Sequence, residues 1–448
     1  MTLSLEPASH KRLLRNFVVI LHAIIELIVI LVGRFPAFDA SASAVLGLES
    51  NWAKAFLRWD VFHFAHIAQD DYVYEYEYAF LPGTPYIMRH GSYLLKHFGL
   101  ITDDDFTRSL IVGAVASTII SVDAVYTLYD LTLVYFPQKF HLALLVSLLS
   151  LFSSSPATLR FAPCSESFFA YLSYKGMLYA ARGKLALASA IFTLAGVFRS
   201  NATMLVIYIL WPFVVEPILV DSHLWGKWKS LLKKIPYAIT LSIPPLLPFI
   251  WHQYKGYQMF CQASSQTWEA RRWCSNQIPL IYSFVQSEYW NVGPFRYWTL
   301  QQLPNFLIAG PVLLLLFNAS IYHISFSLLP RFRILLGANY KRKANDNSDP
   351  ILNPSLAPHA IHALALSNML LVSAHTQIAL RLVCALPFTY WAAARLFFLK
   401  RQNAFESSKL KPEDCTTTLS RAARWWVAWS ILWGTISLVT WAVFLPPA

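Results

Sequence analysis

The sequence is poor in charged residues and in cysteine. Only 13% of its 448 residues are Asp, Glu, Lys or Arg, against roughly 25% in ordinary soluble domains, and this excludes a soluble globular protein. Five cysteines are too few for a disulfide scaffold, and the composition also excludes disorder and a collagen-like fibre. The chain is instead 56% hydrophobic, with apolar runs of bilayer-spanning length. We therefore predict an all-α polytopic membrane protein.

The apolar runs predict about 9–11 transmembrane helices in one membrane domain that covers residues 1–448. We place them at 17–33, 109–136, 141–154, 165–181, 185–199, 203–220, 236–252, 304–328, 358–375, 377–399 and 424–444. Between them lie two long loops, 34–108 and 253–303, and a linker at 331–357 that is rich in Asn, Asp, Ser and Pro.

The net charge of +12 has two interpretations. In a soluble protein it would suggest a nucleic-acid partner, whereas in a membrane protein it indicates that basic loops face the cytoplasm. The two long loops together hold 10 basic and 12 acidic residues, while the short segments on the other side hold 21 basic and 7 acidic. This asymmetry predicts a cytoplasmic N-terminus, both long loops outside, a cytoplasmic linker at 331–357 and no nucleic-acid partner.

The first long loop carries a candidate catalytic motif. In a helix, Asp60 and His63 would share a face because they lie three residues apart, with His66 further along it and Trp59 as an apolar anchor. A carboxylate and two imidazoles suit a general base with orienting partners, or metal ligands. The spacing is a weak metal signal, so we predict no metal site. A solvated interfacial helix is the alternative interpretation.

Charged residues also stand at the expected outer ends of spans. Glu166 follows a serine at a helix start, where it either contacts substrate or interacts with the helix dipole. Arg160 and Arg199, the latter followed by Asn201, are costly at such positions unless they pair or face a wet cavity. An arginine fork suits a phosphate because it bonds two oxygens at once, whereas snorkelling to lipid headgroups is the competing explanation.

The second long loop is dense in aromatic residues and amides. Gln286, Trp290 and Asn291 are of the types that bind sugars, because rings stack on C–H faces and amides pair with hydroxyls. An interfacial aromatic belt would have a similar composition. Cys261 and Cys274 share this loop and could form a disulfide if the compartment is oxidising, so the sequence leaves their pairing open.

Ten short motifs recur along the chain in the order of a known family. They are Trp59-Asp60 with His66-Ile67-Ala68, Phe80-Leu81-Pro82-Gly83, Ser155-Pro156-Ala157, Ser165-Glu166-Ser167, Arg199-Ser200-Asn201, Arg272-Trp273-Cys274, Tyr282-Ser283-Phe284-Val285-Gln286, Tyr289-Trp290-Asn291-Val292-Gly293, Gln302-Leu303-Pro304-Asn305-Phe306 and His375-Thr376-Gln377. Through them the sequence resembles the PIG-V family of GPI mannosyltransferases. It departs from the family pattern at Cys164, Ala202 and Pro294.

The resemblance implies a GT-C type glycosyltransferase of the endoplasmic reticulum membrane. Such an enzyme takes mannose from dolichol-phosphate-mannose on the lumenal side. This family adds the second mannose of the GPI core, in α1,6 linkage, to the mannosyl-glucosaminyl-phosphatidylinositol precursor. For a fungal member the resemblance also implies a small membrane partner subunit. No cofactor beyond the lipid-linked donor is implied, and dependence on a divalent metal is left open.

With an inverting single displacement, the matched aspartate Asp60 is the predicted general base. Arg199 or Arg381 is expected to stabilise the leaving phosphate. The predicted substrate-binding residues are Trp59, His63, His66, Glu166, Arg199, Asn201, Gln286, Trp290, Asn291, His375, Gln377 and Arg381.

Two other functions fit parts of the sequence. One is a different dolichol-phosphate-sugar-dependent transferase of the same architecture. The other is a lipid transporter or scramblase that uses the intramembrane charges Asp123, Asp130, Glu166 and Arg199 as a pathway. Two long outer loops and the absence of a visible repeat weigh against a transporter.

Overall fold

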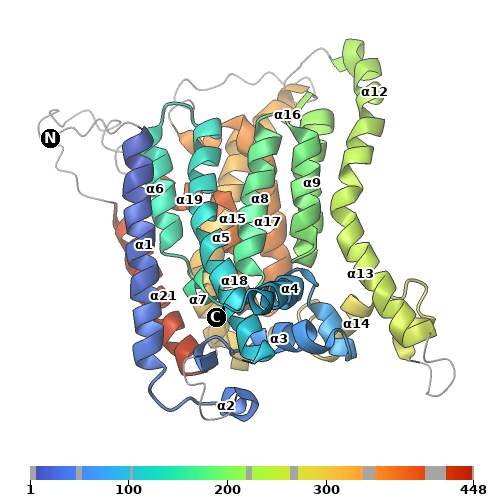
Figure 1. The fold of residues 1–448 in the computed structure, drawn as a ribbon. Helices are drawn as coiled ribbons and strands as arrows, with labels where there is room; N and C mark the ends of the chain where they lie inside the picture. Colours follow the sequence, from blue (N-terminus) through green and yellow to red (C-terminus); the bar gives the residue numbers. More distant parts are fainter. Residues whose placement is uncertain are drawn as a thin grey trace, which may run out of the picture.

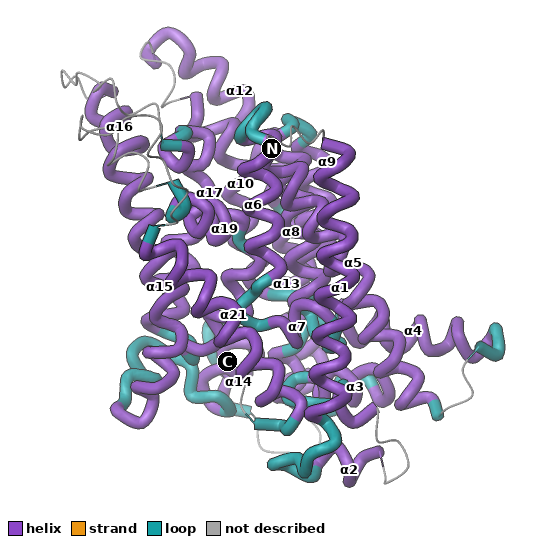
Figure 2. The backbone as a smooth tube through the Cα atoms, turned by 90° about the vertical axis from the view of Figure 1, so that its left-hand side faces the viewer, coloured by secondary structure: helices purple, strands orange, loops and turns teal. Residues whose placement is uncertain are grey.

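The computed structural model describes residues 7–46, 53–100, 104–217, 224–262, 271–335, 349–398 and 420–445. These parts of the chain consist of helices and loops, without a strand (Figure 2). The α-helices are α1 (Pro7–Val32), α2 (Ser41–Leu46), α3 (Val61–Asp70), α4 (Gly83–His97), α5 (Asp105–Tyr135), α6 (Phe140–Leu151), α7 (Pro156–Arg160), α8 (Glu166–Ala181), α9 (Leu185–Gly196), α10 (Ile207–Leu210), α12 (Leu224–Ser242), α13 (Leu247–Tyr257), α14 (Ile281–Glu288), α15 (Leu303–His323), α16 (Leu329–Leu335), α17 (Ala357–Val372), α18 (Ala379–Leu382), α19 (Pro387–Arg395) and α21 (Arg421–Ala442). The all-α prediction is confirmed.

Short 3₁₀ and π segments connect many of these helices. They are η1 (Ala53–Ala55), η2 (Glu75–Ala79), η3 (Ser200–Val206), η4 (Trp211–Val215), η5 (Pro244–Leu246), η6 (Gln258–Gln262), η8 (Arg272–Ser275), η9 (Leu300–Gln302), η10 (Ile324–Leu328), η12 (Pro350–Leu352), η13 (Pro354–Leu356), η14 (Thr376–Ile378) and η15 (Val383–Ala385). Several of them interrupt helices at prolines, where the ring removes a backbone donor.

Four helices in the described parts of the chain are long and apolar enough to cross a membrane: Pro7–Val32, Asp105–Tyr135, Leu300–Ile334 and Pro354–Val372. A fifth span results if Thr376–Ala385 and Pro387–Arg395, bent by 92°, are counted together. Several of the other predicted spans form shorter or interrupted helices in the described residues, and the number of 9–11 spans stays a prediction. The stretch at 141–154, for example, forms the 12-residue α6, which at 1.5 Å per residue is too short to cross about 30 Å of hydrocarbon alone.

The centre of the bundle is formed by α5, α8 and α9, with α15, α17 and α19 behind them (Figure 1). Leu128, Met177 and Phe192 are fully buried there. Gly176 allows α8 and α9 to approach closely, since an added Cβ would lie 2.3 Å from Cε1 of Phe192. Outer helices instead expose apolar side chains to lipid, as Val19, Ile20 and others do on α1.

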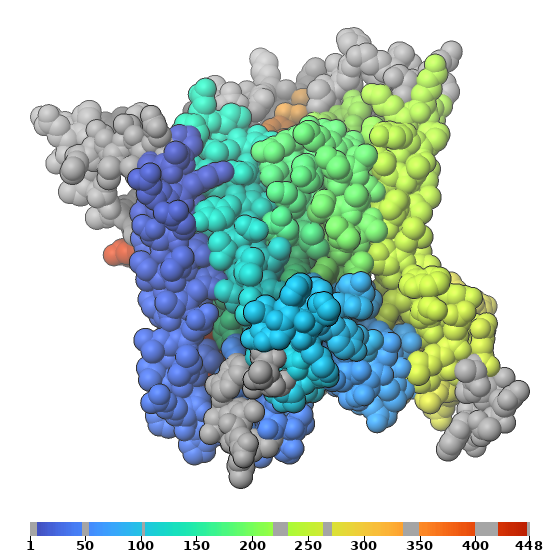
Figure 3. All heavy atoms as spheres, in the orientation of Figure 1, coloured from blue at the N-terminus to red at the C-terminus, as the bar shows by residue number. Residues whose placement is uncertain are grey.

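Both long loops lie at the same end of the bundle. Figure 1 shows α2, α3, α4 and α14 at this end, and the beginning of α1 together with α12 and α16 at the opposite end. The loops pack on each other through a small core in which Tyr78 of the first meets Trp273, Ile281 and Val285 of the second. The space-filling view shows the first loop covering the base of the bundle (Figure 3).

The second loop is reached through an arm formed by α12 and α13 at the edge of the molecule (Figures 1 and 3). The expected interruption by prolines is present, since Pro244 and Pro245 lie in η5 between the two helices and Pro248 lies near the start of α13. Of the expected linker, residues 336–348 lie outside the described residues. Its final part packs on the core, where Leu356 is fully buried.

Candidate active site

Four charged side chains from distant parts of the sequence meet at the end of the bundle that carries the long loops. Nη2 of Arg381 lies 2.6 Å from Oδ2 of Asp60 and 2.6 Å from Oε1 of Glu166. The same Glu166 oxygen accepts hydrogen bonds from Nε of Arg381 at 2.8 Å and from Nη1 of Arg199 at 2.7 Å. We call Asp60, Glu166, Arg199 and Arg381 the charge cluster. Each was singled out from the sequence, and the structure brings them into contact.

Asp60 stands directly before α3, and its side chain is 34% exposed. Trp59 before it has a φ of 50°, in the left-handed region that costs a non-glycine residue roughly 1–2 kcal/mol. Burial alone would raise the pKa of Asp60, but the Arg381 guanidinium outweighs burial, and the pKa lies below the ordinary value of 3.8. The carboxylate is therefore ionised at neutral pH.

Glu166 is the first residue of α8, and its side chain is only 2% exposed. Oε1 accepts the hydrogen bonds from both arginines, whereas Oε2 is buried without a hydrogen-bond partner among the described residues. Glu166 thus ties the two arginines together at a helix N-terminus, where the dipole favours an anion. Its side chain forms ion pairs in addition to any interaction with the helix dipole.

Several polar atoms on or beside the charge cluster lack partners. In the described parts of the chain these are Trp59 Nε1, Arg199 Nε and Asn201 Oδ1, in addition to Glu166 Oε2. Buried polar groups are normally hydrogen-bonded, so such a concentration is typical of a site completed by a ligand or by water.

The two histidines of the first loop have different surroundings. His63 stacks on Phe80 with ring centroids 4.6 Å apart, and burial lowers its pKa although Asp60 opposes that effect. Nδ1 of His66 instead lies 2.5 Å from the buried carboxylate of Glu77. The hypothesis that both imidazoles orient Asp60 is therefore wrong for His66, and the contact partner of Asp60 is Arg381. No group of three His, Cys, Asp or Glu side chains suited to a metal occurs within the described ranges.

Rings from both loops and from the segment after α17 lie in a row that we call the aromatic wall. It consists of His63, Phe80, Trp290, His375 and Tyr297. Trp290 meets the edge of Phe80 at 5.8 Å, and its carbonyl oxygen lies 2.6 Å from Nε2 of His375. His375 stacks on Tyr297 at 4.7 Å, and the Tyr297 hydroxyl donates to Gln377. The wall therefore continues from His63 across Phe80 to the end of α17.

Two predicted residues of the second loop shape its backbone. Asn291 has a φ of 51° and follows Trp290 at a turn. The carbonyl oxygen of Gln286 accepts from the amide of Val292 at 2.8 Å, which closes that turn.

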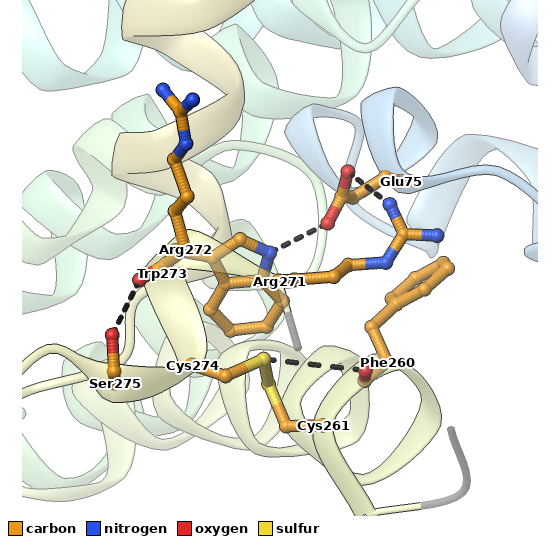
Figure 4. The surroundings of a disulfide bond; sticks show 8 residues. All are labelled: Glu75, Phe260, Cys261, Arg271, Arg272, Trp273, Cys274 and Ser275. Atoms are coloured by element: carbon orange, nitrogen blue, oxygen red, sulfur yellow. Dashed lines mark hydrogen bonds and ion pairs between the residues drawn. A yellow bond between two sulfur atoms is a disulfide. The ribbon is translucent and has the colours of Figure 1, made fainter. Parts of the chain in front are cut away.

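A buried glutamate absent from the sequence predictions fastens the two loops together. Oε1 of Glu75 accepts from Nε1 of Trp273 at 2.5 Å, and its Oε2 lies 2.9 Å from Nη1 of Arg271 (Figure 4). A disulfide joins Cys261 and Cys274 next to this contact. Glu75 was missed because the sequence Glu75-Tyr76-Glu77 gives no sign that both acids are buried.

The C-terminal end of α21 fixes the segment around Asp60. Phe444 stacks on Phe62 at 5.8 Å and meets Trp59 edge-on at 5.2 Å. The Arg58 guanidinium lies 4.9 Å above the Phe444 ring and donates to the carbonyl of Ala442. Phe444 therefore contacts aromatic residues on both sides of Asp60 in the sequence, Trp59 and Phe62. The sequence analysis did not predict a role for Phe444.

Comparison with known proteins assigns the sequence to a family. The profile of the mannosyltransferase (PIG-V) family matches residues 8–448. The chain belongs to this family.

Among its relatives, GPI mannosyltransferase 2 of Cryptococcus neoformans is 30% identical over 423 residues, which are 92% of each chain. GPI alpha-1,6-mannosyltransferase 2 of Mus musculus is 31% identical over 368 residues, 76% of this chain and 72% of the mouse chain. A solved oligosaccharyltransferase of Archaeoglobus fulgidus aligns with 96% of this chain and 55% of its own, at a TM-score of 0.45 and 14% identity. The predicted PIG-V membership is confirmed.

For this PIG-V family member we predict that Phe444→Ala lowers kcat about tenfold and changes KM for the sugar donor little. The lost ring contacts free Trp59 and Asp60 to move, and a small displacement of a catalytic group is costly. Transfer kinetics in membranes, with Phe444→Leu restoring part of the rate, measure the effect. Phe38→Ala is the matched control, because that phenylalanine lies at the same end with its side chain 77% exposed. Equal kcat in Phe444→Ala and Phe38→Ala would contradict the positioning role.

A second prediction concerns pH. Because the pKa of Asp60 lies below 3.8, kcat/KM should not fall through its protonation between pH 7 and pH 5. Arg381→Gln removes the cation but keeps the burial, so the pKa rises and the acidic limb of the profile moves to higher pH. Normalised kcat/KM profiles test this, with Arg296→Gln, a loop arginine outside the cluster, as control. An unmoved acidic limb in Arg381→Gln would contradict the ion-pair argument.

Proposed function

We propose that this protein transfers the second mannose of the GPI core. The donor is dolichol-phosphate-mannose, the acceptor is the mannosyl-glucosaminyl-phosphatidylinositol precursor, and the new linkage is α1,6. The proposal rests on the mannosyltransferase family match and on relatives named GPI alpha-1,6-mannosyltransferase 2. The observation that carries the chemistry is a partly exposed aspartate in contact with Arg381, which Glu166 links to Arg199.

The reaction is an inverting single displacement. The acceptor 6-hydroxyl attacks C1 of mannose, the new C1–O bond forms as the bond from C1 to the phosphate oxygen breaks, and the electron pair leaves with dolichyl phosphate. Asp60 accepts the hydroxyl proton. Arg199 and Arg381 stabilise the charge that develops on the phosphate.

The charge cluster also suggests how Asp60 gains basicity. Free of substrate, Asp60 is paired with Arg381, which holds its pKa low. When the donor phosphate shares Arg381, the cation is partly neutralised by a second anion, and the pKa of the carboxylate rises toward the range of a general base. Glu166 keeps both arginines in place during this exchange.

The sugar rings are positioned by the aromatic wall and by unpartnered polar atoms. Trp59, His63 and Trp290 supply ring faces or a free indole N–H, while Asn201, Gln286 and Asn291 supply amides. His66, His375 and Gln377 support this surface from behind through their contacts with Glu77, Trp290 and Tyr297.

The hydrocarbon chain of the donor needs an apolar path from the arginines into the bilayer. A cavity of about 1190 Å³ lies between α9, α13 and the first loop, and its lining includes Val197, Leu247 and Pro248. Val197 is two residues before Arg199. One wall of the cavity is thus close in sequence to the charge cluster, and another is α13, whose apolar side chains Ile250 and Trp251 are exposed.

The proposed orientation is supported by the distribution of charge and by the fold. The basic residues at the start of α1 lie at the end opposite the charge cluster (Figure 1), and positive segments favour the cytoplasm. The N-terminus is then cytoplasmic and the active site faces the lumen of the endoplasmic reticulum, where the disulfide also forms. A small membrane subunit is the expected partner in a fungus.

We expect Asp60→Asn to lower transfer by about 10²- to 10⁴-fold, because the amide cannot accept the hydroxyl proton. The assay uses microsomes, dolichol-phosphate-mannose and a one-mannose GPI acceptor. Glu288→Gln is the control, since this exposed carboxylate at the end of α14 lies in the second loop and outside the cluster, and its loss should leave the rate unchanged. A wild-type rate for Asp60→Asn would overturn the base assignment.

The function itself is tested in cells that lack their own second-mannose GPI transferase. Expression of the protein should restore GPI-anchored proteins at the surface and remove the accumulated one-mannose precursor, whereas Asp60→Asn should do neither. Lipid analysis of labelled precursors measures this. Persistence of the one-mannose precursor with a well-expressed protein would contradict the proposal, and precursor extension that is independent of the protein would favour a transporter.

A further inference from the structure

Three arginines stand out in the sequence as costly or phosphate-binding cations. Arg199 and Arg381 belong to the charge cluster, whereas Arg160 does not. Arg160 lies at the end of α7, and only 2% of the residue is exposed. The sequence placed it with Arg199 at an outer helix end, but the structure packs it inside the bundle, between α5, α6 and α8. No charged group of the proposed catalytic machinery contacts it in the described residues.

The hydrogen bonds of Arg160 leave its charge uncompensated. Nη2 donates to the carbonyl of Ser150 at 2.5 Å and Nη1 to that of Ser121 at 3.4 Å. These are two of the five N–H groups of a guanidinium, and Nε is buried without a partner. Both acceptors are neutral backbone groups.

The electrostatic surroundings contain no carboxylate that would balance this cation. Among the described residues, the ionisable groups that interact with Arg160 are Tyr390, Cys384, Tyr174 and His22, and none of these side chains is negatively charged at physiological pH. Arg160 makes no ion pair with any described residue. A buried, unpaired charge costs several kcal/mol, and in a membrane domain such a residue is expected to have a partner.

A small cavity adjoins the guanidinium. Besides Arg160 it is lined by polar side chains that include Ser121, Ser150, Ser167 and Tyr390. About 10 Å³ is open to the centre of a water-sized sphere. That is room for one small particle, either a water molecule or a monatomic ion.

We propose that this cavity binds one chloride ion as the counter-ion of Arg160. A chloride accepts the free N–H of Arg160 and supplies the missing negative charge, which a water molecule does not. The lining comes from α5, α6, α7, α8, η15 and α19, so the ion joins the segments that surround the broken α18–α19 span. This site is independent of the transfer reaction.

The test is the thermal unfolding of the full-length protein in detergent or nanodiscs, with sodium chloride replacing sodium gluconate at constant ionic strength. The wild type should show a saturable rise in Tm of about 2 °C with chloride, and bromide should substitute for it. In Arg160→Gln the dependence on chloride should disappear. Arg89→Gln is the matched control, since Arg89 also donates to two backbone carbonyls but has a carboxylate, Asp71, beside it, and it should keep the dependence.

Two results would overturn the proposal. One is a wild-type Tm that is equal in chloride and gluconate, and the other is a chloride effect that survives in Arg160→Gln. If Arg160→Gln does not fold, bromide-soaked wild-type protein decides the question by anomalous scattering. A bromide peak beside the guanidinium supports the site, and the absence of a peak there rules it out.

Discussion

The arrangement of the active site depends on the compensation of one buried carboxylate. Glu166 lies at the start of α8 with almost no exposed surface, and one of its oxygens receives N–H groups from both Arg199 and Arg381. Removing one partner from a buried ion pair typically costs about 3–5 kcal/mol. Three segments that are far apart in sequence are therefore held at one point. The guanidinium of Arg381 also contacts the carboxylate of Asp60.

The helix bundle and the first long loop each supply part of the candidate site. The bundle supplies Glu166 and the arginines, while the first loop supplies Asp60 and the aromatic residues beside it. Two further buried acids, Glu75 and Glu77, hold that loop by accepting hydrogen bonds from the second loop and from its own backbone. Phe444 holds it from the other side, so residues outside the charge cluster determine the position of Asp60.

Arginines 160 and 199 illustrate how far sequence reasoning reaches. Both follow an apolar run and both are cations that need compensation, so the same rule selected them. Packing then separated them: Arg199 pairs with Glu166, whereas Arg160 points into the bundle toward carbonyl groups. The spacing of Asp60, His63 and His66 was likewise read correctly as a helical face, but His66 pairs with Glu77 from a later turn. A local sequence pattern cannot predict an ion-pair or hydrogen-bond partner that lies on another segment of the chain.

The amino-acid sequence by itself determined the class of this protein. Scarce charge and long apolar runs require a membrane domain of helices, and short motifs in order identify the PIG-V family. The asymmetry of basic residues predicts an orientation. The sequence also selected Asp60, Glu166, Arg199 and Arg381 one by one. Only the tertiary structure decided that these four touch, that Glu166 links the arginines, and which apolar runs end too early to span a bilayer. The reason is physical: hydropathy is a sum over neighbouring residues, whereas ion pairs and burial are set by side chains that folding brings together across hundreds of residues.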